Sequence, residues 1–188
     1  FHDDRLGKYV AYVRVNKAYP APLERREHFA RASKRHSGKA GFYMLRTIGR
    51  SETENLATFP MPEVVIEPDA KDPRFGGVGV MDFYTPQVLP YAEAQEAYFL
   101  FTARYLHYED WYLADDLSDY ARSKTVGIRN VGPLDIGFAA SRDGFHWRRY
   151  DRRPWIPLGR EGAFDSKQMY SARGMVFHDD EIWMYYVG

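Results

Sequence analysis

The chain has 188 residues, of which 45% are hydrophobic and 16% are aromatic, and it carries 26 Lys and Arg against 26 Asp and Glu. This hydrophobic content excludes a globally disordered protein, and the balanced charge excludes a protein-wide field that would recruit nucleic acid or an anionic membrane. The absence of Cys excludes disulfides, thiolate metal sites and thiol catalysis, and no apolar run reaches the roughly 18 residues that span a bilayer.

The first predicted unit covers about residues 1–70. Apolar and aromatic runs bounded by turn residues predict strands over Tyr9–Val15, Gly41–Gly49 and Glu63–Glu67. The basic segment Glu24–Lys39 could form a phosphate-binding face. Because acidic residues elsewhere balance its charge, we interpret it instead as a solvated connection or a short helix. A stretch rich in Pro and Gly, Pro68–Gly79, separates this unit from the next.

Two further units follow, over about residues 81–158 and 168–188. In the second unit a strand is predicted over Tyr98–Tyr105, and the stretch Asp135–Arg149 is typical of two strands joined by an Asp-Gly turn. The third unit starts at Tyr170 and stops after its early strand, and a strand-sized apolar and aromatic run covers Glu181–Val187.

These repeated units predict an all-β fold. A sheet of about four strands cannot bury both of its faces alone, and such sheets stack radially as the blades of a β-propeller. About two and a half blades fit in residues 1–188, as one partial propeller domain that has too few blades to close a ring. A β-sandwich is the alternative. The ends of the sequence look cut, so we expect a fragment, whose exposed blade edges favour self-association and whose cellular location stays open.

Several stretches carry a resemblance to a known family, in this order along the chain: Phe1–Arg14, Asp82–Tyr91, Ser141–Trp147, Phe164–Ser166 and Ile182–Tyr186. Together they resemble the five-bladed β-propeller glycosidases. The nearest likeness is to bacterial proteins described as glycoside hydrolase family 32-like, within the wider group of families 32 and 43. The resemblance covers most of the chain apart from Glu24–Lys39 and the insertion Leu113–Val131.

The resemblance implies a glycoside hydrolase with a funnel-shaped site at the propeller axis, where early strands present carboxylates to an oligo- or polysaccharide. One carboxylate acts as nucleophile or base and another as acid, and their separation decides whether configuration is retained or inverted. Family members place a further, stabilising aspartate in an Arg-Asp-Pro element at the start of a blade's first strand. Residues 1–4 occupy the matching place here, so Asp3 is the predicted stabilising residue.

The sequence departs from the family pattern at the other two catalytic elements. The Asn-Asp-Pro-Asn type of element that carries the nucleophile has no counterpart in this chain. Where the family has its acid glutamate, this chain has Tyr84. Asp82 lies two residues earlier, on the same face of a strand, so we predict that it takes the acid role. The alternative function is a non-catalytic carbohydrate-binding or scaffold propeller that lacks the full catalytic set.

Five residues are predicted to bind the substrate: Tyr84, Arg104, Asp165, Tyr170 and Arg173. Arg104 ends an aromatic strand, where it contacts a substrate or pairs with Asp82. Asp165 and Arg173 flank the entry to the third unit, and Tyr170 fits the place of Tyr84 in the next blade.

No cofactor, nucleic-acid partner or membrane span is predicted. A central divalent cation such as calcium would suit a family 43-like site, but the sequence supplies no clear ligand set for it. The polar cluster His107, Glu109 and Asp110 could bind a metal, and we interpret it as a solvated loop.

Overall fold

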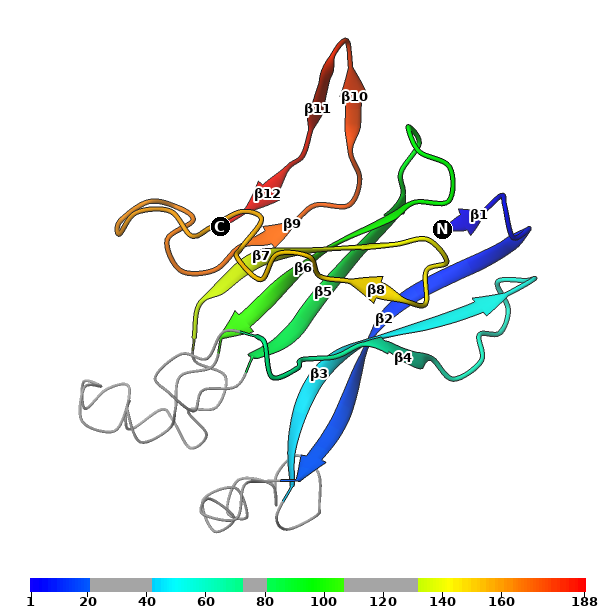
Figure 1. Cartoon of the computed structure of the whole chain (residues 1–188), viewed down its shortest axis with the longest axis horizontal. Coiled ribbons are helices and arrows are strands. Elements are labelled where there is room, and N and C mark those ends of the chain that lie inside the picture. Colours follow the sequence, from blue (N-terminus) through cyan, green and yellow to red (C-terminus); the bar gives the residue numbers. More distant parts are fainter. Residues whose placement is uncertain (21–41, 73–80, 107–131) are drawn as a thin grey trace.

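The computed structural model describes residues 1–20, 42–72, 81–106 and 132–188, and the regular elements in these ranges are β-strands (Figure 1). The strands are β1 (His2–Asp3), β2 (Lys8–Pro20), β3 (Phe42–Thr53), β4 (Glu63–Ile66), β5 (Met81–Pro90), β6 (Tyr98–Leu106), β7 (Leu134–Ser141), β8 (Trp147–Arg148), β9 (Tyr170–Ser171), β10 (Val176–His178), β11 (Glu181–Trp183) and β12 (Tyr186–Val187). The predicted all-β class is confirmed for this part of the chain. None of the described ranges forms a helix with the length and apolarity that a membrane crossing requires.

Two four-stranded antiparallel sheets form the body of the molecule. The first has the strand order β1-β2-β3-β4 and the second has the order β5-β6-β7-β8, so each is a simple meander along the chain. Consecutive antiparallel strands joined in this way are the arrangement of a propeller blade. The number of blades in a closed ring stays a prediction.

The second sheet lies between the first sheet and the third unit. One of its faces packs against the first sheet, through Phe83 and Leu100 on one side and Ile48 on the other. Its opposite face packs Phe101 and Ile136 against Met169, next to β9. Because both faces are covered, β6 is buried along almost its whole length instead of alternating between buried and exposed residues.

The turn between β7 and β8 holds the first two sheets together. Asp143 accepts hydrogen bonds from the backbone N–H groups of Phe145 and His146, at 2.8 and 2.7 Å, which shapes the turn as expected. The Gly144 carbonyl in this turn accepts a hydrogen bond from the Tyr12 hydroxyl of β2, at 2.8 Å. The Tyr12 ring meets Trp147 edge to face, so the tryptophan contributes to packing between sheets.

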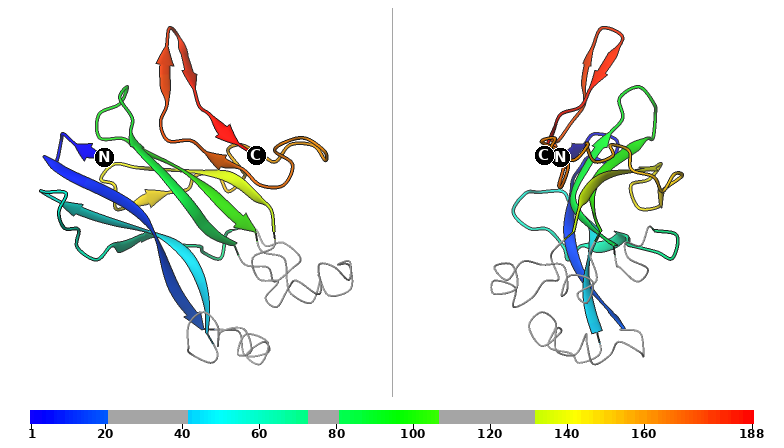
Figure 2. Two further views of the ribbon diagram at one scale, coloured as in Figure 1. Left: turned by 180° about the vertical axis from the view of Figure 1, so that it is seen from behind. Right: turned by 90° about the vertical axis from the view of Figure 1, so that its left-hand side faces the viewer.

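The third unit contains short strands: β9 begins at Tyr170, where the early strand was predicted, and β11 and β12 lie within the predicted run Glu181–Val187. β9 pairs with β12, and β10 pairs with β11 in a hairpin that projects from the rest of the molecule (Figure 2). The hairpin exposes the apolar side chains of Phe177, Ile182 and Trp183. An isolated two-stranded hairpin of this kind is marginally stable in water. Self-association stays a prediction, and these exposed apolar residues support it.

Candidate functional site

Asp82 lies at the start of β5, where the two large sheets meet. Its side chain is 1% exposed, and its Oδ2 atom accepts a hydrogen bond of 2.8 Å from Nη1 of Arg46. The backbone N–H of Arg46 also donates to this oxygen, at 3.4 Å. Arg46 belongs to β3, so this ion pair joins the edge strand β5 of the second sheet to the first sheet.

Three tyrosines surround this ion pair. Asp82 faces Tyr105 across the β5–β6 ladder, and Tyr84 lies two residues further along β5. The Arg46 guanidinium lies 5.1 Å from the ring centre of Tyr84 and 5.6 Å from that of Tyr105. Tyr170 of β9 lies 6.1 Å from Tyr84, ring centre to ring centre. We call Arg46, Asp82, Tyr84, Tyr105 and Tyr170 the Asp82 cluster.

Burial governs the ionisation of the Tyr105 hydroxyl. It raises the pKa of Tyr105 to about 12, with the Arg46 charge opposing this shift and the Asp82 charge adding to it. Burial likewise raises the pKa of Tyr170. Both phenols therefore keep their protons at neutral pH and can serve as hydrogen-bond donors.

The backbone of β5 is strained directly beside Tyr84. Thr85 has a φ angle of 48°, and the strand register shifts between Tyr84 and Pro86. A β-branched residue in this left-handed region costs about 1–3 kcal/mol and is characteristic of ligand sites. The Thr85 hydroxyl is also buried without a hydrogen-bond partner among the described residues. Strain and an unused polar group therefore mark the strand that carries Asp82 and Tyr84.

Asp3 lies far from this cluster. It lies in β1, the first strand of the first sheet, and pairs with Lys8 at the beginning of β2. Its Oδ2 atom accepts a hydrogen bond from the hydroxyl of Tyr98, the first residue of β6, and its Oδ1 atom accepts one from the backbone N–H of Arg5 at 3.1 Å.

The register of β6 sets the distance between the two predicted catalytic carboxylates. Asp3 is bound at Tyr98, whereas Asp82 pairs with Tyr105 at the other end of the strand. Seven residues of extended strand span about 23 Å. Paired glycosidase carboxylates stand about 5–9.5 Å apart. The structure thus does not bring Asp3 and Asp82 together, and they do not flank a single glycosidic bond.

Asp3 has hydrogen bonds that stabilise its charged form. Burial acts to raise its pKa, but the hydrogen bonds from Tyr98 and Arg5 outweigh burial, and the pKa of Asp3 lies below its usual value. The stabilisation is therefore fully present above the unfolded-state pKa, near 3.8, and is lost as the pH falls through the lower folded-state pKa.

We predict that Asp3→Asn lowers the free energy of unfolding by about 1–3 kcal/mol at neutral pH, because the variant loses charge-assisted hydrogen bonds in a buried place. The difference from the unmodified chain should shrink as the pH falls below the folded-state pKa. Urea unfolding at neutral and at acidic pH measures both differences. A difference that stays constant over the whole pH range would contradict the role given to the Asp3 charge.

Arg104 points away from the Asp82 cluster. It faces Phe83, not Asp82, across the ladder, so its side chain lies on the opposite face of the sheet. Its Nε and Nη2 atoms donate to the Asp135 carboxylate at 2.6 and 2.7 Å, and Nη1 donates to the Arg152 carbonyl at 2.5 Å. The predicted alternative of a pair with Asp82 is wrong. Gly137 makes room for this arrangement, because a Cβ atom there would lie 2.5 Å from Cδ of Arg104.

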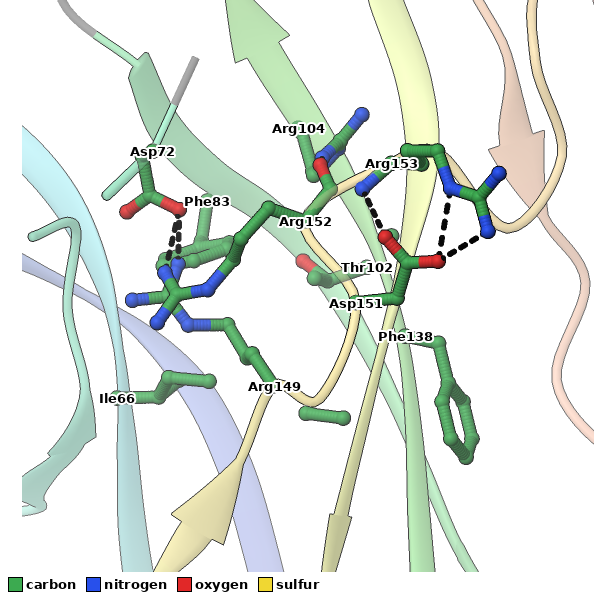
Figure 3. Close-up of a pocket in the computed structure, with 12 residues that line it drawn as sticks. Ile66, Asp72, Phe83, Thr102, Arg104, Phe138, Arg149, Asp151, Arg152 and Arg153 are labelled. Carbon is green, nitrogen blue, oxygen red and sulfur yellow. Dashed lines mark hydrogen bonds and ion pairs between the residues drawn. The ribbon is translucent and has the colours of Figure 1, made fainter.

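A narrow pocket on this opposite face is lined by arginines that already have partners (Figure 3). Arg149 and Arg152 both donate to Asp72, the second of them at 2.9 Å, and both also pair with Asp69. Figure 3 shows the two guanidinium groups directed at the same carboxylate. These ion pairs connect the segment after β4 to the segment after β8. We therefore interpret the arginines that line this pocket as structural residues that hold the two sheets together.

Asp165 and Arg173 have separate environments. Asp165 accepts a hydrogen bond of 2.9 Å from the Tyr186 hydroxyl, and its side chain fills the space beside Gly159. Arg173 is exposed, and its charge acts on the terminal amino group of Phe1. Of the five predicted substrate-binding residues, the structure brings Tyr84 and Tyr170 together beside Asp82. The substrate-binding roles themselves stay predictions.

No metal site is found in the described ranges, which contain no group of three His, Asp or Glu side chains that could hold an ion. The polar cluster His107, Glu109 and Asp110 lies outside the described residues, as do Glu24–Lys39 and most of the insertion Leu113–Val131.

Sequence comparisons identify no relative for this chain: no protein-family model matches it, and no curated protein matches it. The fold does have a similar solved structure, described as a glycoside hydrolase, with a TM-score of 0.51 and 12% sequence identity. The similarity covers 93% of this chain and 36% of that chain. At this identity the similarity supports a glycosidase-like fold, and membership of family 32 or family 43 stays a prediction.

Proposed function

We propose that this chain carries part of the sugar-binding and catalytic site of a glycoside hydrolase, located at the Asp82 cluster. The observation that supports it best is a buried carboxylate surrounded by three tyrosines, on a strained strand, in a fold similar to that of a glycoside hydrolase. Aromatic rings offer flat apolar faces to sugars, and their hydroxyl groups bond to sugar hydroxyls. A carboxylate supplies the negative charge that an oxocarbenium-like transition state requires.

Within this proposal, the ion pair with Arg46 refines the role of Asp82. A carboxylate in such a pair carries negative charge and has no proton to donate, so the role of nucleophile or charge-stabilising group suits it better than that of acid. As the bond from the anomeric carbon to the leaving oxygen breaks, positive charge develops on the sugar ring and the Asp82 carboxylate faces it. The leaving oxygen takes a proton from a general acid, the oxygen of a water molecule bonds to the anomeric carbon, and the proton that this water loses restores the acid.

The alternative, a non-catalytic carbohydrate-binding propeller, has one specific observation in its favour. The other buried carboxylates in the described part of the chain have partners elsewhere: Asp3 with Tyr98, Asp72 with Arg149 and Arg152, Asp135 with Arg104, and Asp165 with Tyr186. The other buried carboxylates of the described residues thus bind partners outside the Asp82 cluster, whereas cleavage of a glycosidic bond requires a pair of carboxyl groups at one site. A site that binds sugars without cleaving them would look the same in this region.

Binding and cleavage of a panel of oligosaccharides separate these functions. We expect Tyr84→Ala to weaken sugar binding about tenfold or more, because it removes the ring that Tyr170 and Arg46 face. The matched control is Tyr150→Ala, at a tyrosine that is 75% exposed and lies outside the cluster. Product release measures cleavage, and calorimetric titration measures binding. Binding without cleavage would favour the alternative, and equal loss in both variants would contradict a site at Tyr84.

A further inference from the structure

Arg14 is a cation with an unusual environment in this chain. It lies on β2 with its side chain exposed, and its guanidinium carbon is 5.8 Å from the ring centre of Tyr84. Five other cations stand over aromatic rings in the described ranges, and each also pairs with a carboxylate: Arg5 with Asp3, Lys17 with Glu67, Arg46 with Asp82, Arg50 with Glu52, and Arg149 with Asp69 and Asp72. Arg14 makes no ion pair within those ranges.

The strand register holds Arg14 next to Arg46. Arg46 faces Asn16 across the β2–β3 ladder, and Arg14 lies two residues from Asn16 on the same strand. Arg14 and Arg46 are therefore diagonal neighbours on one face of the sheet, with Cα atoms about 7–8 Å apart. Both guanidinium groups approach the ring of Tyr84, so Arg14 places a second positive charge beside the cluster. Two neighbouring cations attract a negatively charged group more strongly than either cation does alone.

We propose that the sugar bound at the Asp82 cluster is acidic, and that Arg14, next to Arg46, binds its negative group. This inference rests on the proposed function of the cluster. A guanidinium that stacks on a tyrosine keeps its N–H edge available, and that edge matches the two oxygens of a carboxylate or a sulfate. The ligand class is thus a uronic acid or a sulfated sugar, whose ring lies near Tyr84 and Tyr170 while its charged group reaches Arg14.

The test compares sugars that differ in charge alone. Trisaccharides of galacturonic, glucuronic and mannuronic acid are titrated into the chain beside their methyl esters, which keep the shape and remove the charge. A sulfated galactose trisaccharide beside its neutral form distinguishes sulfate from carboxylate. We expect one acidic sugar to bind about tenfold more tightly than its neutral counterpart at low salt. Arg14→Gln should abolish this preference, whereas Arg148→Gln, at an exposed arginine on β8, should preserve it.

The outcomes separate the two proposals. A neutral sugar that binds as tightly as its acidic counterpart, with no effect of Arg14→Gln, would overturn the inference about charge and leave a sugar site at the cluster. Failure of every sugar in both panels to bind would overturn the proposed function, and the inference with it. The unfolding temperature of the Arg14→Gln variant is measured as a control. If it equals that of the unmodified chain, a lost preference for the acidic sugar reflects a change in binding and not misfolding.

Discussion

Arg104→Met should lower the free energy of unfolding by about 3–5 kcal/mol, the largest effect on stability that we expect in this chain. The substitution leaves the Asp135 carboxylate buried without the two hydrogen bonds that Arg104 donates to it. It also removes the donor to the Arg152 carbonyl, and so loosens the segment that carries the ion pairs to Asp69 and Asp72. Urea or thermal unfolding measures the change.

A second variant shows whether the cost comes from the unpaired charge. The double variant Arg104→Met with Asp135→Leu removes both charges, so it should recover a large part of the lost stability. An Arg104→Met chain as stable as the unmodified chain would contradict this structural role. So would a double variant that is less stable than Arg104→Met alone.

Asp82→Asn should lower the kcat of glycoside hydrolysis by about 10²- to 10⁴-fold, the size of effect that a positioned acid-base or nucleophilic side chain supplies. The substitution keeps the shape of the side chain and removes the charge that pairs with Arg46 and that the proposed function assigns to the transition state. Binding of the substrate should change much less than its turnover. Initial rates at saturating substrate give kcat, and titration gives the affinity.

The matched control is Asp151→Asn, which neutralises an exposed carboxylate whose partner is Arg153. It should leave both kcat and affinity unchanged. Because Asp82 is buried in an ion pair, the thermal unfolding of Asp82→Asn is measured at the same time, and its rates are taken well below its unfolding temperature. Full hydrolytic activity in a folded Asp82→Asn variant would exclude Asp82 from the chemistry.

The strands could be predicted well from the sequence because they depend on local patterns. The predicted strands over Tyr9–Val15 and Tyr98–Tyr105 lie within β2 and β6, and the Asp143-Gly144 turn joins β7 to β8. Alternating or continuous apolar runs bounded by turn residues carry this information. In the third unit the sequence indicated the start at Tyr170 and the run Glu181–Val187, but strands of two or three residues are too short to produce a period, so their bounds and pairing could not be predicted.

The candidate site could be predicted only in part because it depends on which strand edges meet. Tyr84 and Asp82 share a face by the period of a strand, and the structure confirms that placement. The separation of Asp3 from Asp82 could not be predicted, since a two-residue strand does not reveal from sequence which residues it lies against. Arg46 and Arg14 were missed: each sits in an ordinary strand pattern, and only the packing of β3 and β2 beside β5 brings them to Asp82 and Tyr84.

The most direct test of the site is a structure of the chain with a bound oligosaccharide, chosen as the tightest binder of the panel. We predict that the sugar lies against Tyr84 and Tyr170, with its anomeric carbon next to the Asp82 carboxylate. A sugar found instead at the Asp3 and Tyr98 end of β6, or at the arginine-lined pocket of Figure 3, would contradict a glycosidase site at the Asp82 cluster.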